Sequence, residues 1–410
     1  MAKEKKKVPN LRFKGFTDDW EQHKLGEVAE IIGGGTPSTK ISNYWNGDIN
    51  WYTPAEISNF IYTRKSKRKI SMEGLENSSA RLLPVGTVLF TSRAGIGKTA
   101  ILSKEGTTNQ GFQSIVPNKK LLDSYFIFSL TNELKKYGET HGAGSTFIEI
   151  SGRELAKAPL NLPALKEQKN ISLLHRKLDN LISLQQRKLD LLKQLKKGLL
   201  QKMFADKGSK RPILRFEGFN DDWEGRKLEN SADYIRGSFP QPYGNKEWYG
   251  GTNAKPFVQV VDVNTNMRLN KKTKEQISVL AQPKSRFVPS DSIVVTLQGS
   301  IGRVAITQYD SYVDRTLLIF TKYKVPVDKY FWAYSIQNIF RIEKQKAPGG
   351  TIKTITKRAL SSFEVSLPVQ EEQKKIGTLL KNIDDIITSQ QEEVSKLKKI
   401  KKSLLQQMFI

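Results

Sequence analysis

The chain has 410 residues, which exceeds one typical domain and predicts two domains with connecting helices. Lys plus Arg number 67 against 41 Asp plus Glu, a net charge of +26 that predicts a polyanionic partner, nucleic acid ahead of a membrane surface. The absence of cysteine excludes disulfides, thiolate zinc sites and cysteine nucleophiles. Because no long apolar run or signal-peptide pattern is visible, we expect a cytoplasmic protein that does not enter a membrane.

An opening phrase occurs twice, as LRFKGFTDDWE at residues 11–21 and LRFEGFNDDWE at residues 214–224. The match continues beyond the phrase, for example from Pro84 to Pro289 and from Leu155 to Leu360, so the repeat unit covers about half of the chain. A repeat of this size predicts two similar modules. The paired aspartates of each phrase are expected to cap or pack this shared frame and not to act in catalysis.

A glycine- and proline-containing loop follows in each half, at residues 31–45 and 234–248, and such residues predict an exposed loop. Hydroxyl, amide, basic and aromatic side chains in these loops are candidates for DNA contact, because they can bind both phosphates and base edges. The candidates are Thr36, Ser38, Thr39, Lys40, Tyr44, Ser238, Gln241 and Tyr243.

Short β-rich segments are predicted at residues 86–92, 257–263 and 291–297. Single helices are predicted at residues 122–138 and 328–345. Each module is therefore expected to be mixed α and β.

The segment SRAGIGKTA at residues 92–100 is similar to a phosphate-binding P-loop but has Ser92 where the first glycine is needed. The second copy, QGSIGRVA, also lacks the Lys-Ser/Thr pair, so a structural turn after a strand is predicted. Polar side chains on such a turn can approach DNA closely. A third loop pair, GAGSTF at residues 142–147 and PGGTIK at residues 348–353, has the same character. The remaining candidates are Arg315 and residues on these turns and loops: Arg93, Lys98, Ser145, Thr146, Gln298, Ser300, Arg303, Thr351 and Lys353.

Each half ends in a predicted amphipathic helix of about 40 residues, at residues 162–204 and 367–409. The apolar positions of the first helix recur 205 residues later in the second, and they are Ile171, Leu174, Leu178, Leu181, Leu189, Leu192, Leu195, Leu199 and Met203. Gln185 and Gln390 interrupt the two seams at the same level, where a polar residue can fix register. The two helices are expected to pair with each other.

The chain connectivity then requires antiparallel helices with one module at each end, related by an internal pseudo-two-fold axis. By the same symmetry, Phe409 is expected near Leu11, as Phe204 leads into Leu214. The predicted fold is α+β, with two mixed α/β domains separated by two long helices that form an antiparallel coiled coil. The expected divisions are residues 1–160 and 211–366 for the domains, 161–210 for the first helix and linker, and 367–410 for the second helix.

Catalysis has little support in this sequence. The chain has only three histidines, no cysteine and no HExxH motif, so neither catalytic residues nor a metal site is predicted. One alternative is a basic coiled-coil scaffold that binds nucleic acid or anionic surfaces without sequence specificity. A self-contained nucleic-acid enzyme is a further alternative that the missing motifs disfavour.

Several motifs follow one another in a specific order: the twin openings, GGGTPST, RAGIGKTA, NLP and SLP before EQK, and the helix ends LLQKMF and LLQQMF. In this order they resemble the specificity subunit of type I restriction-modification systems. The resemblance implies a non-catalytic subunit whose two target recognition domains bind a bipartite, asymmetric sequence in double-stranded DNA. It also implies two adenine-N6 methyltransferase subunits, which use S-adenosylmethionine, and restriction motor-nuclease subunits, which use ATP and Mg. This chain itself is expected to bind no cofactor.

Overall fold

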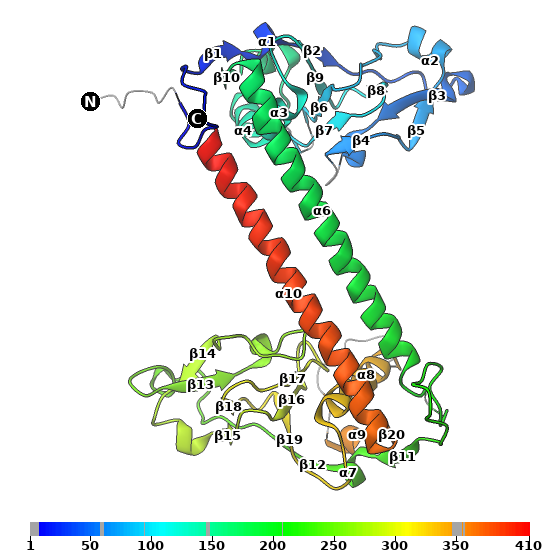
Figure 1. The fold of residues 1–410 in the computed structure, drawn as a ribbon, viewed down its shortest axis with the longest axis vertical. Helices are drawn as coiled ribbons and strands as arrows, with labels where there is room; N and C mark the ends of the chain where they lie inside the picture. The colour runs from blue at the N-terminus through cyan, green and yellow to red at the C-terminus, as the bar shows by residue number, and fades with distance from the viewer. Residues whose placement is uncertain are drawn as a thin grey trace. The chain divides into compact units, whose positions relative to one another are not determined.

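The computed structural model describes residues 8–57, 61–93, 95–144, 148–206, 208–346, 355 and 357–410. The chain forms two compact units, Met1–Leu184 with Val394–Ile410, and Gln185–Glu393. Both units combine strands with helices, and each contains part of the two long helices, α6 (Leu165–Lys202) and α10 (Gln370–Met408) (Figure 1). The predicted fold class is confirmed.

The first unit contains a two-stranded, a five-stranded and a three-stranded sheet. In spatial order, the strands are β1 (Glu21–Lys24) and β10 (Pro159–Leu162); β2 (Ala29–Gly33), β9 (Gln113–Pro117), β6 (Val88–Phe90), β7 (Thr99–Leu102) and β4 (Tyr62–Thr63); and β5 (Arg68–Ile70), β3 (Trp45–Tyr52) and β8 (Gly106–Thr108). Its shorter helices are α1 (Leu25–Val28), η1 (Ser42–Tyr44), η2 (Pro54–Glu56), α2 (Met72–Glu76), α3 (Ser124–Ser129), α4 (Thr131–His141) and α5 (Gly152–Leu155).

The second unit repeats this plan with one two-stranded and two four-stranded sheets. In spatial order, the strands are β11 (Glu224–Lys227) and β20 (Glu364–Leu367); β12 (Ala232–Arg236), β19 (Leu317–Tyr323), β16 (Ile293–Thr296) and β17 (Val304–Ile306); and β14 (Glu275–Ile277), β13 (Lys255–Val258), β18 (Ser311–Val313) and β15 (Arg286–Val288). Its shorter helices are α7 (Leu228–Ser231), η3 (Lys246–Trp248), η4 (Val260–Asp262), η5 (Gln282–Lys284), α8 (Lys329–Lys346) and α9 (Lys357–Ser361).

Most predicted elements are present, with two differences. The segment 257–263 continues β13 only to Val258 and then forms η4, because the Asp262 carboxylate accepts a hydrogen bond from the Gln259 N–H. The predicted helix at 122–138 is two helices, α3 and α4, which meet at Leu130. There the Thr131 hydroxyl donates to the Phe128 carbonyl, a local bond that competes with the helical ladder.

The two long helices pack antiparallel in each unit. In the first unit His175 lies beside Phe409 and Asp179 beside Lys401, so positions advance along α6 as they retreat along α10. In the second unit the Gln390 side chain donates to the Gln185 side chain at 2.7 Å, which confirms the predicted polar level.

The predicted apolar seam is partly wrong. Four of its members are 39% to 51% exposed, namely Leu181, Leu195, Ile386 and Ile400. Ile387, next to one of them, is buried in a cluster with Leu189 and Ile383. The seam is narrower than predicted because ion pairs and the glutamine pair occupy part of the helix contact.

In each unit the opening phrase is hydrogen-bonded to the C-terminal end of a long helix. The Leu11 N–H donates to the Gln407 carbonyl at 2.9 Å, and the Leu214 N–H donates to the Lys202 carbonyl at 2.8 Å. Phe409 packs against Trp20 and Phe126. The predicted proximity of Phe409 to Leu11 is therefore confirmed.

A buried ion pair explains why the phrase is needed twice. Arg12 forms two hydrogen bonds of 2.8 Å with Glu167 on α6, whose side chain is 1% exposed. Arg215 repeats the arrangement with Glu372 on α10 at 2.7 and 2.8 Å. In the second phrase the exposed Asp222 carboxylate accepts a hydrogen bond from Arg211 at 2.6 Å, a surface ion pair within the chain that leads into α7.

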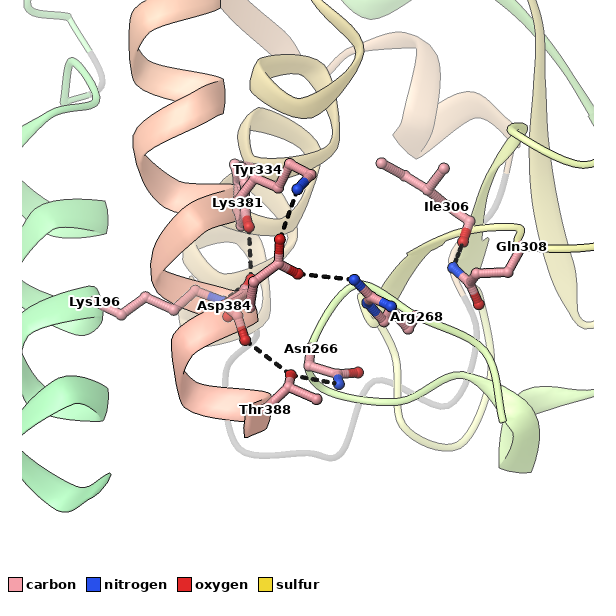
Figure 2. A network of polar contacts seen from close by, with 10 residues as sticks. Lys196, Asn266, Arg268, Ile306, Gln308, Tyr334, Lys381, Asp384 and Thr388 are labelled. Atoms are coloured by element: carbon pink, nitrogen blue, oxygen red, sulfur yellow. Dashed lines mark hydrogen bonds and ion pairs between the residues drawn. The ribbon is translucent and has the colours of Figure 1, made fainter. Parts of the chain in front are cut away.

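A second polar cluster also occurs in both units. The Tyr125 hydroxyl on α3 and the Lys401 ammonium on α10 both donate to Asp179 on α6. In the other unit, Tyr334 on α8 and Lys196 on α6 both donate to Asp384 on α10 (Figure 2). We call these the Tyr–Asp–Lys triads, and each ties a shorter helix of its unit, α3 or α8, to both long helices.

Lys401→Met tests the first triad. It leaves the Asp179 carboxylate without its cation in a poorly solvated site, and we expect the free energy of unfolding to fall by roughly 3 kcal/mol in guanidinium titrations. Lys196→Met is the matched variant in the second unit. Adding Asp179→Asn to Lys401→Met should recover most of the loss, and a double variant no more stable than the single one would contradict the assignment.

His175 generates a prediction about pH. Its side chain is fully buried, and neither ring nitrogen has a hydrogen-bond partner among the described residues. Burial, aided by Lys401 and opposed by Asp179, lowers the pKa of His175 to about 4. In the unfolded chain the pKa is about 6.5, so below that pH the unfolded state binds a proton that the folded state does not. The stability that the neutral His175 side chain contributes is therefore fully present above about pH 6.5 and is lost as the pH falls toward about 4.

The repeat supplies the variant, because Leu380 is the fully buried equivalent of His175. His175→Leu should raise the free energy of unfolding by about 1–3 kcal/mol at neutral pH, since it removes an unsatisfied polar group. It should also flatten the stability profile between pH 6.5 and 4. Urea titrations across this range measure both effects, and a variant with the wild-type pH profile would disprove the role of His175.

Candidate nucleic-acid interface

Three loops of the first unit meet at residues 109–111. The Gly35 N–H donates to the Thr108 carbonyl at 2.8 Å, and the Ser92 N–H donates to the Gly111 carbonyl at 2.9 Å. The Thr36 hydroxyl donates to the Gln110 side chain at 2.6 Å. The loop after β2 and the turn after β6 are therefore held on either side of Gln110.

The first glycine of each loop is explained by this close approach. A Cβ on Gly34 would lie 2.0 Å from the Asn109 carbonyl oxygen, and one on Gly237 would lie 2.2 Å from that of Val313. The residues that follow Pro37 point outward: Ser38, Thr39 and Lys40 are exposed and Tyr44 is half-buried. The Trp45 indole donates to the Ser38 carbonyl at 3.0 Å and orders this stretch.

The second unit has the same backbone plan with different side chains. The Ser238 N–H donates to the Val313 carbonyl at 3.0 Å, and Arg315 occupies the position of Gln110. The Arg315 guanidinium lies 5.4 Å from the centre of the Tyr243 ring, a cation–π arrangement. Gln259 donates to the Tyr243 hydroxyl at 2.9 Å.

Tyr243 remains a hydrogen-bond donor near neutral pH. Burial, with the Asp314 carboxylate as the next cause, raises the pKa of Tyr243 to about 12. The residue is nevertheless 45% exposed. Gln241 beside it is also exposed, and Ser238 is half-buried.

The P-loop-like segments are turns stabilised by a threonine. Thr91 donates to the Gly95 carbonyl at 2.7 Å and accepts from the Lys98 N–H at 2.9 Å. Thr296 makes the same two bonds, with Ser300 and Arg303. The threonine hydroxyl thus occupies the interior of each turn, as expected for a structural turn.

Glycine is needed in these turns for conformation and for packing. Gly97 has φ +85°, and a Cβ there would lie 2.4 Å from the Lys135 Cβ; Gly302 has φ +80° and would lie 2.6 Å from the Phe340 Cβ. Each turn therefore packs directly against a helix, which is α4 in the first unit and α8 in the second.

The candidate side chains on these turns differ in exposure. Arg93 and Lys98 are exposed, while Gln298 and Ser300 are half-buried. Arg303 is also half-buried and donates to the Val263 carbonyl at 3.3 Å. The remaining candidates, Ser145, Thr146, Thr351 and Lys353, lie outside the described residues.

A further pair of segments was missed from the sequence. The residues RKSK at 64–67 and KKTK at 271–274 precede β5 and β14, which pair with β3 and β13 in the same way. Their cationic side chains are exposed. Aligning the two halves through this stretch would have revealed them, because both copies are basic at the same three positions.

The described part of the chain contains neither a candidate metal cluster nor a candidate membrane span. No group of three or more His, Asp or Glu residues there could hold a metal ion. Among the same residues, no helix is both long enough and apolar enough to cross a membrane.

Comparisons with known proteins agree on one family. The family model for the type I restriction modification DNA specificity domain matches twice, at residues 17–194 and 220–399. The type I restriction enzyme MjaIX specificity subunit of Methanocaldococcus jannaschii is 27% identical, covering 94% of this chain and 92% of its own length. The putative MjaX specificity subunit of the same organism is 28% identical, with 95% and 92% covered.

A solved structure shares the fold. The S subunit of a type I restriction-modification system from M. genitalium matches with a TM-score of 0.67 at 13% identity, covering 98% of this chain and 99% of that one. Because the family model matches both halves and most of the length, this chain belongs to the type I restriction-modification DNA specificity family.

Proposed function

We propose that this chain recognises a bipartite, asymmetric DNA target, one half-site for each unit, and directs partner subunits to it. The observation that carries the proposal is the repeated loop cluster, which has the same backbone hydrogen bonds but different side chains at equivalent positions, Gln110 and Arg315. A shared frame with unlike contact groups is the arrangement that two different half-sites require.

These groups suit different bases. A glutamine amide can bind the N6 and N7 edge of adenine, and an arginine can bind the O6 and N7 edge of guanine. The exposed hydroxyls of Ser38 and Thr39, together with Lys40, Arg93 and Lys98, are suited to phosphates or base edges. In the second unit, Tyr243 and Gln241 would take this role beside Arg315.

The proposed division of labour along the chain follows the repeat. Residues 1–160 and 211–366 form the two recognition domains, residues 161–210 the first helix and linker, and residues 367–410 the second helix. The long helices would set the number of base pairs between the half-sites.

The chain contributes recognition and no catalysis. We propose as partners two adenine-N6 methyltransferase subunits, which bring S-adenosylmethionine, and restriction motor-nuclease subunits, which bring ATP and Mg. Family membership supports this assembly, since the similar proteins are named as specificity subunits of type I restriction enzymes.

Exchanging one recognition domain tests the function. Residues 24–160 make a suitable cassette, because Lys24 and Pro159 face each other in the β1–β10 pair. With a cassette from a related subunit of different specificity, the methylated sequence should change in one half and keep the other. Sequencing of modified adenines in cells that contain the complex is the measurement. A scaffold without sequence specificity would give no defined motif before or after the exchange.

Lengthening both helices tests the spacer. Seven residues add about 10 Å of helix and keep the apolar face in phase. Inserting seven helix-forming residues after Gln185 and seven after Gln390 should widen the unrecognised gap by about three base pairs, at about 3.4 Å each, without altering either half-site. The same seven residues inserted between Ser209 and Lys210, outside the helices, should leave the gap unchanged. An altered half-site in the lengthened protein would refute the spacer role.

A further inference from the structure

The two basic turns, residues 64–67 and 271–274, are built by the same hydrogen bonds. The Lys67 N–H donates to the Glu56 carboxylate at 2.6 Å, and the Lys274 N–H donates to the Asp262 carboxylate at 2.8 Å. Within each turn a hydroxyl, from Ser66 or Thr273, donates to the carbonyl two residues later. The turns are therefore formed structures in both units and not merely charged stretches of sequence.

The carboxylates that hold the turns are themselves fixed. Glu56 accepts from the Thr53 N–H at 3.0 Å at the start of η2, and Asp262 accepts from the Gln259 N–H at 2.9 Å at the start of η4. Asp262 is completely buried. Because the backbone is already ordered, a ligand that binds these turns pays little additional conformational entropy.

The cationic side chains of the turns face solvent. Arg64, Lys65 and Lys67 in one unit, and Lys271, Lys272 and Lys274 in the other, are exposed. None of these six side chains forms an ion pair with any residue that the structure describes. Three like charges on four residues repel one another, and a polyanion bound across them removes that repulsion.

Each basic turn is connected to the loop cluster of its own unit. In the first unit, η2 carries Glu56 and also Pro54, whose ring lies 2.6 Å from where a Cβ of Gly111 would be, next to Gln110. In the second unit, the backbone of Gln259 is held by Asp262, while its side chain donates to the Tyr243 hydroxyl. One short helix thus positions both the basic turn and the candidate base-contacting residues.

We propose that the two basic turns bind the DNA phosphate backbone beside each half-site and do so without regard to base sequence. The inference rests on the proposed function. It adds that the two recognition domains, which differ in their base-contacting side chains, share one phosphate-binding element at the same place in the fold. Swapping the base-contacting loops would therefore leave the phosphate contacts in register.

The test uses the full chain assembled with its methyltransferase subunits, and duplexes with and without the methylated motif. The variants are Arg64→Gln/Lys65→Gln/Lys67→Gln and Lys271→Gln/Lys272→Gln/Lys274→Gln. The control is Lys119→Gln/Lys120→Gln/Lys166→Gln, which removes three exposed lysines of the first unit outside the turns. Affinity is measured from 50 to 200 mM salt.

Each turn variant should reduce the slope of log affinity against log salt by about 2.7, because about 0.9 of a counterion is released per phosphate contact. Between 50 and 200 mM salt, the affinity of the variant should then change about 40-fold less than that of the wild type. Both duplexes should lose affinity by a similar factor, and the methylated motif should stay the same. The control should keep the wild-type slope.

Several outcomes would overturn the proposal. A wild-type salt slope in the turn variants means that the cations do not contact phosphates, and a changed motif means that they contact bases. A variant that binds DNA normally but no longer assembles with the methyltransferase subunits assigns the turns to a protein interface. If the wild-type complex shows no sequence preference, the proposed function fails, while the salt slopes still decide whether the turns bind phosphates.

Discussion

The buried pairing of an opening-phrase arginine with a glutamate on a long helix constrains this architecture. Glu167 and Glu372 are almost completely buried, so each carboxylate requires a bidentate cation in place of water. Arg12 and Arg215 supply it only if the opening phrase runs across the helix at that level. The pairing therefore fixes where each recognition domain begins relative to the helix that follows it, and it explains why the phrase is retained in both halves.

The frame was predictable from sequence because its signals are long and repeated. The periodic apolar pattern, which occurs twice, predicted both long helices, and the twin phrases predicted that Phe409 lies near Leu11. The seam positions were less predictable. Ile386 and Ile387 are adjacent and equally apolar, and only packing decides that Ile387 is buried.

The candidate interface was predictable in its loops but not in its contacts. Glycine and proline located the loop that contains Thr36, but nothing in the sequence pairs Thr36 with Gln110 74 residues away. Arginine is a residue type that often contacts DNA, and yet the Arg303 guanidinium donates to the Val263 backbone carbonyl. The basic turns were overlooked because a charge run is usually only a solvated surface. Their hydrogen bonds to Glu56 and Asp262, which lie 11 and 12 residues earlier in the chain, follow no local sequence motif.

The matched hydrogen bonds from Leu11 to Gln407 and from Leu214 to Lys202 have a consequence for how such a chain arises. At one junction the helix end is joined covalently to the next opening phrase through residues 205–213, and at the other the same contact forms without any peptide link. The covalent link is thus dispensable for the geometry of the junction. A gene fusion of two half-length ancestors, or a reading frame that starts at the other junction, would keep both of these junction contacts.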